Sequence, residues 1–230
     1  MLIENPWTRL RELTAARIAL GRAGHSLPTR ELLSFQLAHA KARDAVWHPL
    51  DCTVFAELNP IQLQTRAADR LTYLRRPDLG RRLSPDSRPR LHRGSYDAAL
   101  ILADGLSAQA LHHHAEPFLI ALRTELDGWS LAPLTLVEQG RVAIGDEIGE
   151  LLGARLAVVL IGERPGLGSP DSLGIYLTWG PRVGRTDAER NCVSNVRAEG
   201  LAPDLAAKRV GWLMNMARQK QVTGVSSHVL

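Results

Sequence analysis

The sequence predicts an α/β fold in which an N-terminal helical region is followed by a mainly parallel, Rossmann-like sheet flanked by helices. Residues 157–161 form an unbroken apolar run, rich in β-branched side chains, that stops at Gly162. Such a run is typical of a strand buried on both faces. After residue 96 similar runs alternate with helical patterns, which indicates βαβ units. We therefore expect two parts: residues 1–95, a helical region with an Arg-rich connector, and residues 96–230, an α/β domain.

Composition limits the class of protein. A chain of 230 residues with 45% hydrophobic residues can bury a substantial core. The net charge of +4 is unevenly shared: the first 100 residues hold 16 basic and 10 acidic side chains (+6), and residues 101–230 hold 12 and 14 (−2). The two cysteines, Cys52 and Cys192, lack redox or metal-site spacing. Because no signal core, presequence or apolar run of about 18 residues occurs, we expect a cytoplasmic protein without disulfide or membrane span.

The first part of the chain shows helical patterns. Asn5 and Pro6 can begin a helix that ends near residue 20. Thr29 can cap a second helix that runs to about Val46. This second helix carries a mostly apolar stripe, formed by Leu32, Leu33, Gln36, Leu37 and Ala40. We interpret residues 51–74 as a third helical region.

An arginine-rich segment at residues 75–93 contains seven arginines and three prolines. This composition opposes both burial and a continuous helix, so we expect an extended connector on the surface. Two roles stay open for it. The arginines can be solvated or paired with Asp78 and Asp86, or their guanidinium groups can bind carboxylates or phosphates of a partner.

The second part begins with a buried strand at residues 96–103, a turn at Asp104 and Gly105, and a helix that Ser107 caps and Gly128 closes. The later elements follow from apolar periodicity and glycine stops. In order, they are a strand within 131–140, a helix over 141–153, a strand over 155–162, a strand over 172–180, and a helix from Pro203 to before Gly224.

Few residues have the spacing that catalysis requires. Consecutive helix residues point about 100° apart, so His112, His113 and His114 together do not predict a metal site. Nucleophile-elbow, Walker and G-x-G-x-x-G patterns are absent. We therefore predict no catalytic and no metal-ligating residue. What is left is a rim of strand ends, with Asp104 and Glu163, where a ligand can be held.

Four runs of residues carry a family resemblance. They are ADGLSA from Ala103, GRVAIGDEIGELLGA from Gly140, IGERPGLGSPDSLGIYLT from Ile161 and DAERNCVSN from Asp187. In this order they resemble the small subunit of ethanolamine ammonia-lyase. The segment RPDLGRRL, which starts at Arg76, also looks like that family. The resemblance extends over almost the whole chain.

The resemblance implies a subunit of an adenosylcobalamin-dependent radical lyase that converts ethanolamine to acetaldehyde and ammonia. It implies a hetero-oligomer whose large subunit holds the substrate, so that this chain alone is inactive. The cobalamin-contacting positions of the family fall on Val142, Glu163 and Cys192. Because no D-x-H-x-x-G pattern occurs around the histidines, we expect the base-on form of the cofactor.

Alternatives remain at single residues and for the whole chain. Glu163 can instead form an internal ion pair with Arg164 or another arginine, and Cys192 can be a small buried hydrophobe. The connector is expected to face the large subunit. A different function, a nucleic-acid-binding module, would use the same arginines for phosphates, although interleaved aromatic residues are missing. Enteric members of the family carry an additional amino-terminal segment associated with encapsulation in a bacterial microcompartment, whereas this sequence starts directly at the IENPW helix, so encapsulation stays open.

Overall fold

The computed structural model describes residues 7–14 and 16–225. The α-helices within these residues are α1 (Thr29–Trp47), α2 (Arg70–Arg75), α3 (Ala108–Arg123), α4 (Ile144–Leu152) and α5 (Pro203–Lys220). The strands are β1 (Ile61–Gln64), β2 (Tyr96–Ala103), β3 (Thr135–Glu138), β4 (Ala154–Gly162), β5 (Leu173–Trp179) and β6 (Arg190–Val196). Short 3-10 helices lie at Thr8–Glu12, Cys52–Leu58, Leu79–Arg81, Arg88–Arg90 and Asp187–Glu189.

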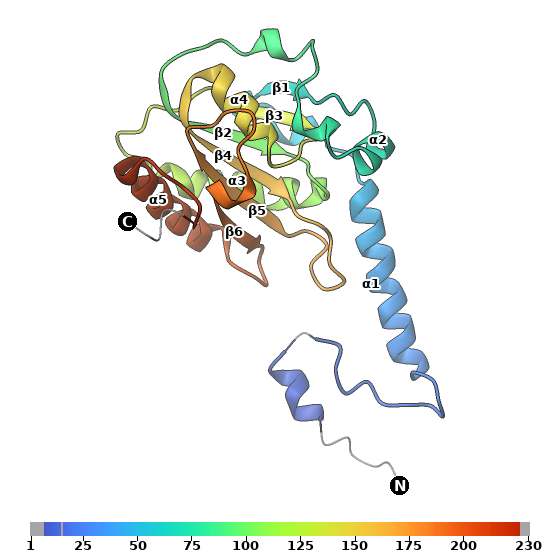
Figure 1. Cartoon of the computed structure of the whole chain (residues 1–230). Helices are drawn as coiled ribbons and strands as arrows, with labels where there is room; N and C mark the ends of the chain where they lie inside the picture. Colours follow the sequence, from blue (N-terminus) through green and yellow to red (C-terminus); the bar gives the residue numbers. More distant parts are fainter. Residues whose placement is uncertain (1–6, 15, 226–230) are drawn as a thin grey trace.

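The strands form one sheet in the order β1-β3-β2-β4-β5-β6 (Figure 1). The first four strands of this order run parallel, whereas β5 is antiparallel to β4 and β6 is antiparallel to β5. The sheet is therefore mixed, and the expectation of a mainly parallel sheet was wrong. Only residues 163–172 connect β4 to β5. A parallel crossover needs a dozen or more residues, so this connection allows only an antiparallel neighbour.

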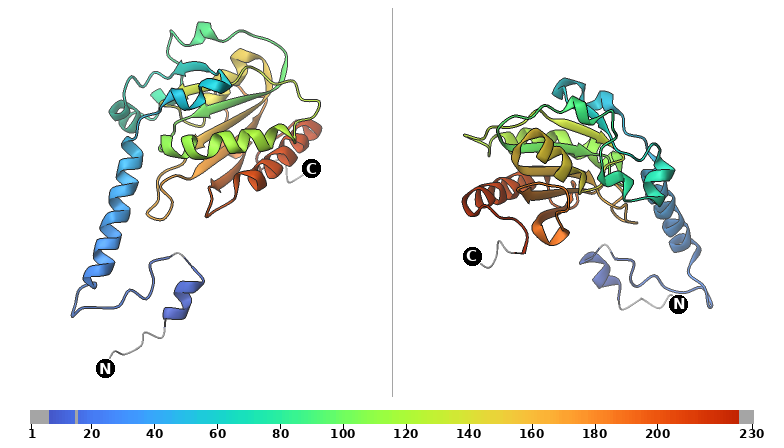
Figure 2. Two further views of the ribbon diagram at one scale, coloured as in Figure 1. Left: turned by 180° about the vertical axis from the view of Figure 1, so that it is seen from behind. Right: turned by 45° about the horizontal axis from the view of Figure 1, so that its top comes forward.

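Helices cover both faces of the sheet (Figures 1 and 2). α3 and α5 pack on one face, where Leu102 and Val158 of the central strands are buried. α4 packs on the other face, where Ile101 and Val159 are buried. Successive side chains of a strand point to opposite faces, so β2 and β4 supply both cores. The α/β fold flanked by helices is thus confirmed.

Two N-terminal expectations need correction. Beyond the turn at Thr8–Glu12, residues 16–28 have no helix. The expected start of a helix at Asn5 and Pro6 lies outside the described residues. Most side chains from residue 16 to 28 are exposed, and a short helix without a packed face is marginal in water. Residues 51–74 are not one helical region, since β1 lies within them and pairs with β3.

The helix expected from Thr29 is confirmed as α1, which ends at Trp47. It projects away from the sheet and its covering helices (Figures 1 and 2). Ala45 is its one buried residue, and the predicted apolar stripe is exposed, with Leu33 and Leu37 each 58% accessible. An apolar helix face of this kind is typical of a surface that a partner covers.

The arginine-rich connector lies on the surface but is anchored at several points. Leu83 is fully buried. Nη2 of Arg76 lies 2.7 Å from the Asp78 carboxylate, and Nη1 of Arg88 lies 2.6 Å from Glu147 of α4. Some of its guanidinium groups are therefore engaged within the chain, and these are not free for phosphates of a partner.

No element was expected at residues 190–196, yet β6 forms the edge of the sheet there. Its sequence is mostly polar, because only one of its faces packs against the rest of the chain. In the part of the chain that the structure describes, no helix has both the length and the apolar character needed to cross a membrane.

Candidate functional site

A cavity of about 400 Å³ lies at the carboxyl ends of β2 and β4, beside the loop that leads from β3 into α4. Val142, which precedes α4, and Glu163, which follows β4, both line it. Its wall also includes Tyr73, Arg141 and Tyr176. In open α/β sheets, ligands bind where connections from adjacent strands leave toward opposite faces. This condition holds here, because β2 continues into α3 and β3 into α4 on the other face.

Glycines allow the strand ends to meet closely. The backbone N–H of Leu106 donates to the carbonyl oxygen of Gly162 at 2.9 Å. A Cβ atom on Gly162 would lie 2.0 Å from the carbonyl oxygen of Ser107, so no side chain fits there. Gly105 has a φ of +56°, which favours glycine. These two glycines bring the β2 and β4 ends together at one side of the cavity.

Asp104 is buried beneath the cavity and joins several elements. One carboxylate oxygen accepts a hydrogen bond from the Gly140 N–H at 3.0 Å, and the other lies 3.4 Å from Nη1 of Arg70. Arg70 also donates to the carbonyl oxygens of Gly105 and Val46, at 2.8 and 2.7 Å. Burial raises the pKa of Asp104 to about 6, although the nearby Arg70 charge favours ionisation.

We expect Asp104 to make stability depend on pH. Its pKa of about 6 in the folded chain exceeds the ordinary 3.8. The folded state therefore binds the Asp104 proton more tightly than the unfolded state does, which stabilises the fold at low pH. This contribution to stability is fully present below about pH 4 and is lost as the pH rises through about 6. From pH 4.5 to 7.5, the free energy of unfolding of the wild type should fall by about 2 kcal/mol relative to Asp104→Asn. Urea unfolding of both proteins at both pH values measures these free energies. The same free-energy difference between wild type and Asp104→Asn at both pH values would contradict the assigned pKa.

Glu163 is held by three donors. The Ser194 hydroxyl donates to Oε1 at 2.6 Å, and the Ser172 hydroxyl and the Asn195 N–H donate to Oε2 at 2.5 and 3.2 Å. Within the described residues Glu163 forms no ion pair, so the alternative of a pair with Arg164 is wrong. A carboxylate has about four lone-pair positions, so Glu163 retains acceptor capacity toward the cavity.

Cys192 is not part of the cavity wall but lies next to it. It is the register partner of Tyr176, which does line the cavity. The alternative of a buried hydrophobe is wrong, because Cys192 is exposed. Although the residue is exposed, its thiol is partly desolvated by neighbouring groups, and this desolvation raises the pKa of the thiol. The Glu163 charge also raises this pKa, whereas the hydrogen bond with Tyr176 lowers it by less than the other two effects raise it. Cys192 is therefore a protonated thiol at neutral pH and a poor nucleophile.

Sequence reasoning missed the group around Tyr73. Its hydroxyl donates to the Gly140 carbonyl oxygen at 3.0 Å. The guanidinium carbons of Arg141 and Arg70 lie 4.1 and 4.9 Å from the centre of its ring, which favours cation–π attraction. Nε of Arg141 is buried and has no hydrogen-bond partner among the described residues. No sequence signal marked these residues, because their segments meet only through the sheet.

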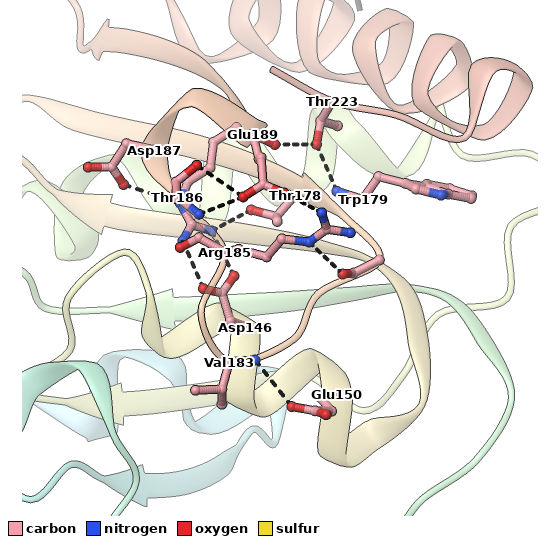
Figure 3. Close-up of polar contacts among 12 residues, drawn as sticks. Asp146, Glu150, Thr178, Trp179, Val183, Arg185, Thr186, Asp187, Glu189 and Thr223 are labelled. Carbon is pink, nitrogen blue, oxygen red and sulfur yellow. Dashed lines mark hydrogen bonds and ion pairs between the residues drawn. The ribbon is translucent and has the colours of Figure 1, made fainter. Parts of the chain in front are cut away.

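A buried ion pair holds β6 against α4. The Arg190 guanidinium makes two bonds to the Asp146 carboxylate, at 2.7 and 2.8 Å, and donates to the Thr178 hydroxyl at 2.7 Å. Asp146 and Thr178 appear in Figure 3 with the loop that carries Asp187 and Glu189. This network fixes the start of β6, the strand that carries Cys192.

Comparison with known proteins agrees with this arrangement of motifs. A family model described as "Ethanolamine ammonia-lyase light chain (EutC)" matches residues 4–227. The chain is 57% identical over 236 residues to the ethanolamine ammonia-lyase small subunit of Azotobacter vinelandii, with 96% of this chain and 87% of that one covered. It is 56% identical over 237 residues to the small subunit of Pseudomonas fluorescens Pf0-1, with 97% and 86% covered. These matches confirm the resemblance seen in the sequence. The chain therefore belongs to the ethanolamine ammonia-lyase light chain family.

Proposed function

We propose that this chain binds adenosylcobalamin at the cavity beside Val142 and Glu163, at an interface with the large subunit of ethanolamine ammonia-lyase. The name "small subunit" carried by its relatives implies a large partner. The observation that carries the proposal is the convergence of Val142 and Glu163, from separate motifs, on one cavity. Tyr176 links the third predicted residue, Cys192, to the same wall.

The residues around the cavity fit one edge of a corrinoid. The corrin periphery carries carboxamides, whose N–H groups need acceptors. Glu163 offers a fixed carboxylate, and Gly105 and Gly162 let the strand ends pack closely at one side of the cavity. A cavity of about 400 Å³ is too small for the whole cofactor. The chain is therefore suited to form one wall, with the large subunit forming the other.

When bound, adenosylcobalamin supplies the radical that starts the conversion of ethanolamine to acetaldehyde and ammonia. This chain binds the cofactor and fixes its orientation. Glu163 accepts hydrogen bonds from the carboxamides at the corrin periphery, and Val142 makes an apolar contact with the corrin. The protonated Cys192 thiol packs beside Tyr176. We propose the base-on form of the cofactor, because no D-x-H-x-x-G pattern occurs in the sequence. The chain contributes no catalytic residue and is inactive alone.

Two surfaces are suited to the large subunit. The apolar face of α1, defined by Leu33 and Leu37, is exposed with respect to the described residues. The connector, with Arg81 exposed and Arg82 half-buried, extends beside the sheet. We assign the α1 face to apolar contact with the large subunit, and the connector to contact with acidic groups of the large subunit.

We expect Glu163→Gln to weaken retention of adenosylcobalamin by the assembled enzyme about tenfold to a hundredfold. The amide keeps the shape but removes the charge, and a hydrogen bond to a charged group contributes about 1.5–3 kcal/mol. Equilibrium dialysis of the cofactor against the two-subunit complex measures this. The matched control is Glu199→Gln, which changes a carboxylate that is 79% exposed and should leave retention unchanged. Equal retention in both variants would exclude the assigned role of Glu163.

A further inference from the structure

A second group of chemically reactive side chains lies on α3 and the loop of residues 163–172. It consists of His113, His114 and Asp171. Nδ1 of His113 lies 3.5 Å, and Nε2 of His114 lies 3.3 Å, from the same carboxylate oxygen, Oδ2 of Asp171. All three ligand atoms lie within 4.8 Å of one another. These residues are separate from those that line the cavity.

The folding of the loop explains why these residues meet. The Ser107 hydroxyl, at the start of α3, donates to the carbonyl oxygen of Pro170 at 2.9 Å. This bond places Asp171 over the first turns of α3, within reach of both imidazoles. The third histidine of the run, His112, faces elsewhere, since its Nε2 accepts a hydrogen bond from the backbone N–H of Asp51. The three histidines therefore do not converge, as expected, but two of them converge on a carboxylate from a distant segment.

The distances within the group favour a shared metal ion over direct pairing. Charge-assisted N–H···O bonds measure about 2.7–2.9 Å, shorter than the 3.3 and 3.5 Å found here. Around a tetrahedral ion with metal–ligand bonds of about 2.0–2.1 Å, neighbouring ligand atoms are roughly 3.3–3.4 Å apart. Two of the three distances, from Oδ2 of Asp171 to Nδ1 of His113 and to Nε2 of His114, are close to this spacing. The third distance, between the two imidazole nitrogens, closes by rotation of the His113 side chain, which is 58% exposed.

The donor set defines the class of ion. Two imidazole nitrogens and one carboxylate oxygen suit first-row divalent transition metals, and three protein ligands leave a position for water. The His114 side chain is only 10% exposed, whereas His113 is accessible, so the ion can reach a partly pre-formed site. We propose that His113, His114 and Asp171 bind Zn²⁺ or a similar ion, which connects α3 to the loop that carries Glu163.

Calorimetric titration of chelator-treated full chain with Zn²⁺ tests this proposal. We expect one ion per chain, and at least about tenfold weaker binding for His113→Ala and for Asp171→Asn. His113 is exposed, so its variant keeps the fold. His92→Ala, which removes an exposed histidine outside the group, is the control and should bind like the wild type.

Thermal unfolding provides a second readout, because an ion that binds only the folded chain raises its Tm. Zn²⁺ should raise the Tm of the wild type and of His92→Ala, but not that of His113→Ala or Asp171→Asn. Absence of saturable Zn²⁺ binding, or equal affinity in all four proteins, would overturn the proposal.

Discussion

Asp146→Ala should lower the free energy of unfolding by about 3–5 kcal/mol, because it leaves the Arg190 guanidinium without its buried charged partner. Both side chains are only 3% exposed, and the two bonds between them are 2.7 and 2.8 Å long. Burial alone would lower the pKa of Arg190, but the hydrogen bonds and charges of Asp146 and Asp187 together outweigh it and raise that pKa. Arg190 therefore stays charged, and Asp146 is the buried carboxylate that compensates this charge.

The same guanidinium offers a matched control. Asp187 also pairs with Arg190, at 3.3 Å, but its side chain is 96% exposed. Asp187→Ala should therefore change stability by at most about 1 kcal/mol. Thermal unfolding of both variants measures the contrast, which corresponds to a fall in Tm of roughly 10 °C for Asp146→Ala alone. Similar Tm values for the two variants would refute the account of this network.

Leu33→Glu together with Leu37→Glu should abolish assembly with the large subunit. Each leucine that becomes buried in an interface contributes about 1.5–3 kcal/mol, and each glutamate adds a desolvation cost. We therefore expect affinity for the large subunit to fall at least about a hundredfold. The fold of the isolated chain should persist, since both side chains are 58% exposed. Co-purification with tagged large subunit and circular dichroism measure the two effects.

A matched control makes the same change from leucine to glutamate on α5, which lies across the molecule from α1 (Figures 1 and 2). Leu205 is 52% exposed there, and Leu205→Glu should co-purify like the wild type. If the α1 double variant assembles normally, the apolar face of α1 is not the contact with the large subunit.

Much of the fold followed from local patterns in the sequence. The apolar runs of β2 and β4, the Ser107 cap of α3 and the Gly153 stop of α4 all lie where the patterns put them. Strand direction was predicted wrongly at β5, although the short connection after Gly162 already favoured an antiparallel neighbour. β1 and β6 were missed because they are short or edge strands, whose polar residues resemble loops.

The candidate site was predictable only in part. Glu163 and Val142 could be placed at strand ends because the apolar runs stop next to them. The hydroxyls that hold Glu163, from Ser172 and Ser194, depend on the register of β5 and β6. Likewise, no pattern brings Asp171 to His114, because their contact depends on the path of a loop. Long-range packing of this kind is not encoded in any local periodicity.

Reconstitution of ethanolamine deamination tests the central claim most directly. Acetaldehyde formation should be measured with large subunit, adenosylcobalamin and this chain, and with each component omitted in turn. We expect activity only when all three are present, because under the proposed function this chain supplies one wall of the cofactor site and no catalytic group. Full activity of the large subunit and adenosylcobalamin without this chain would contradict it.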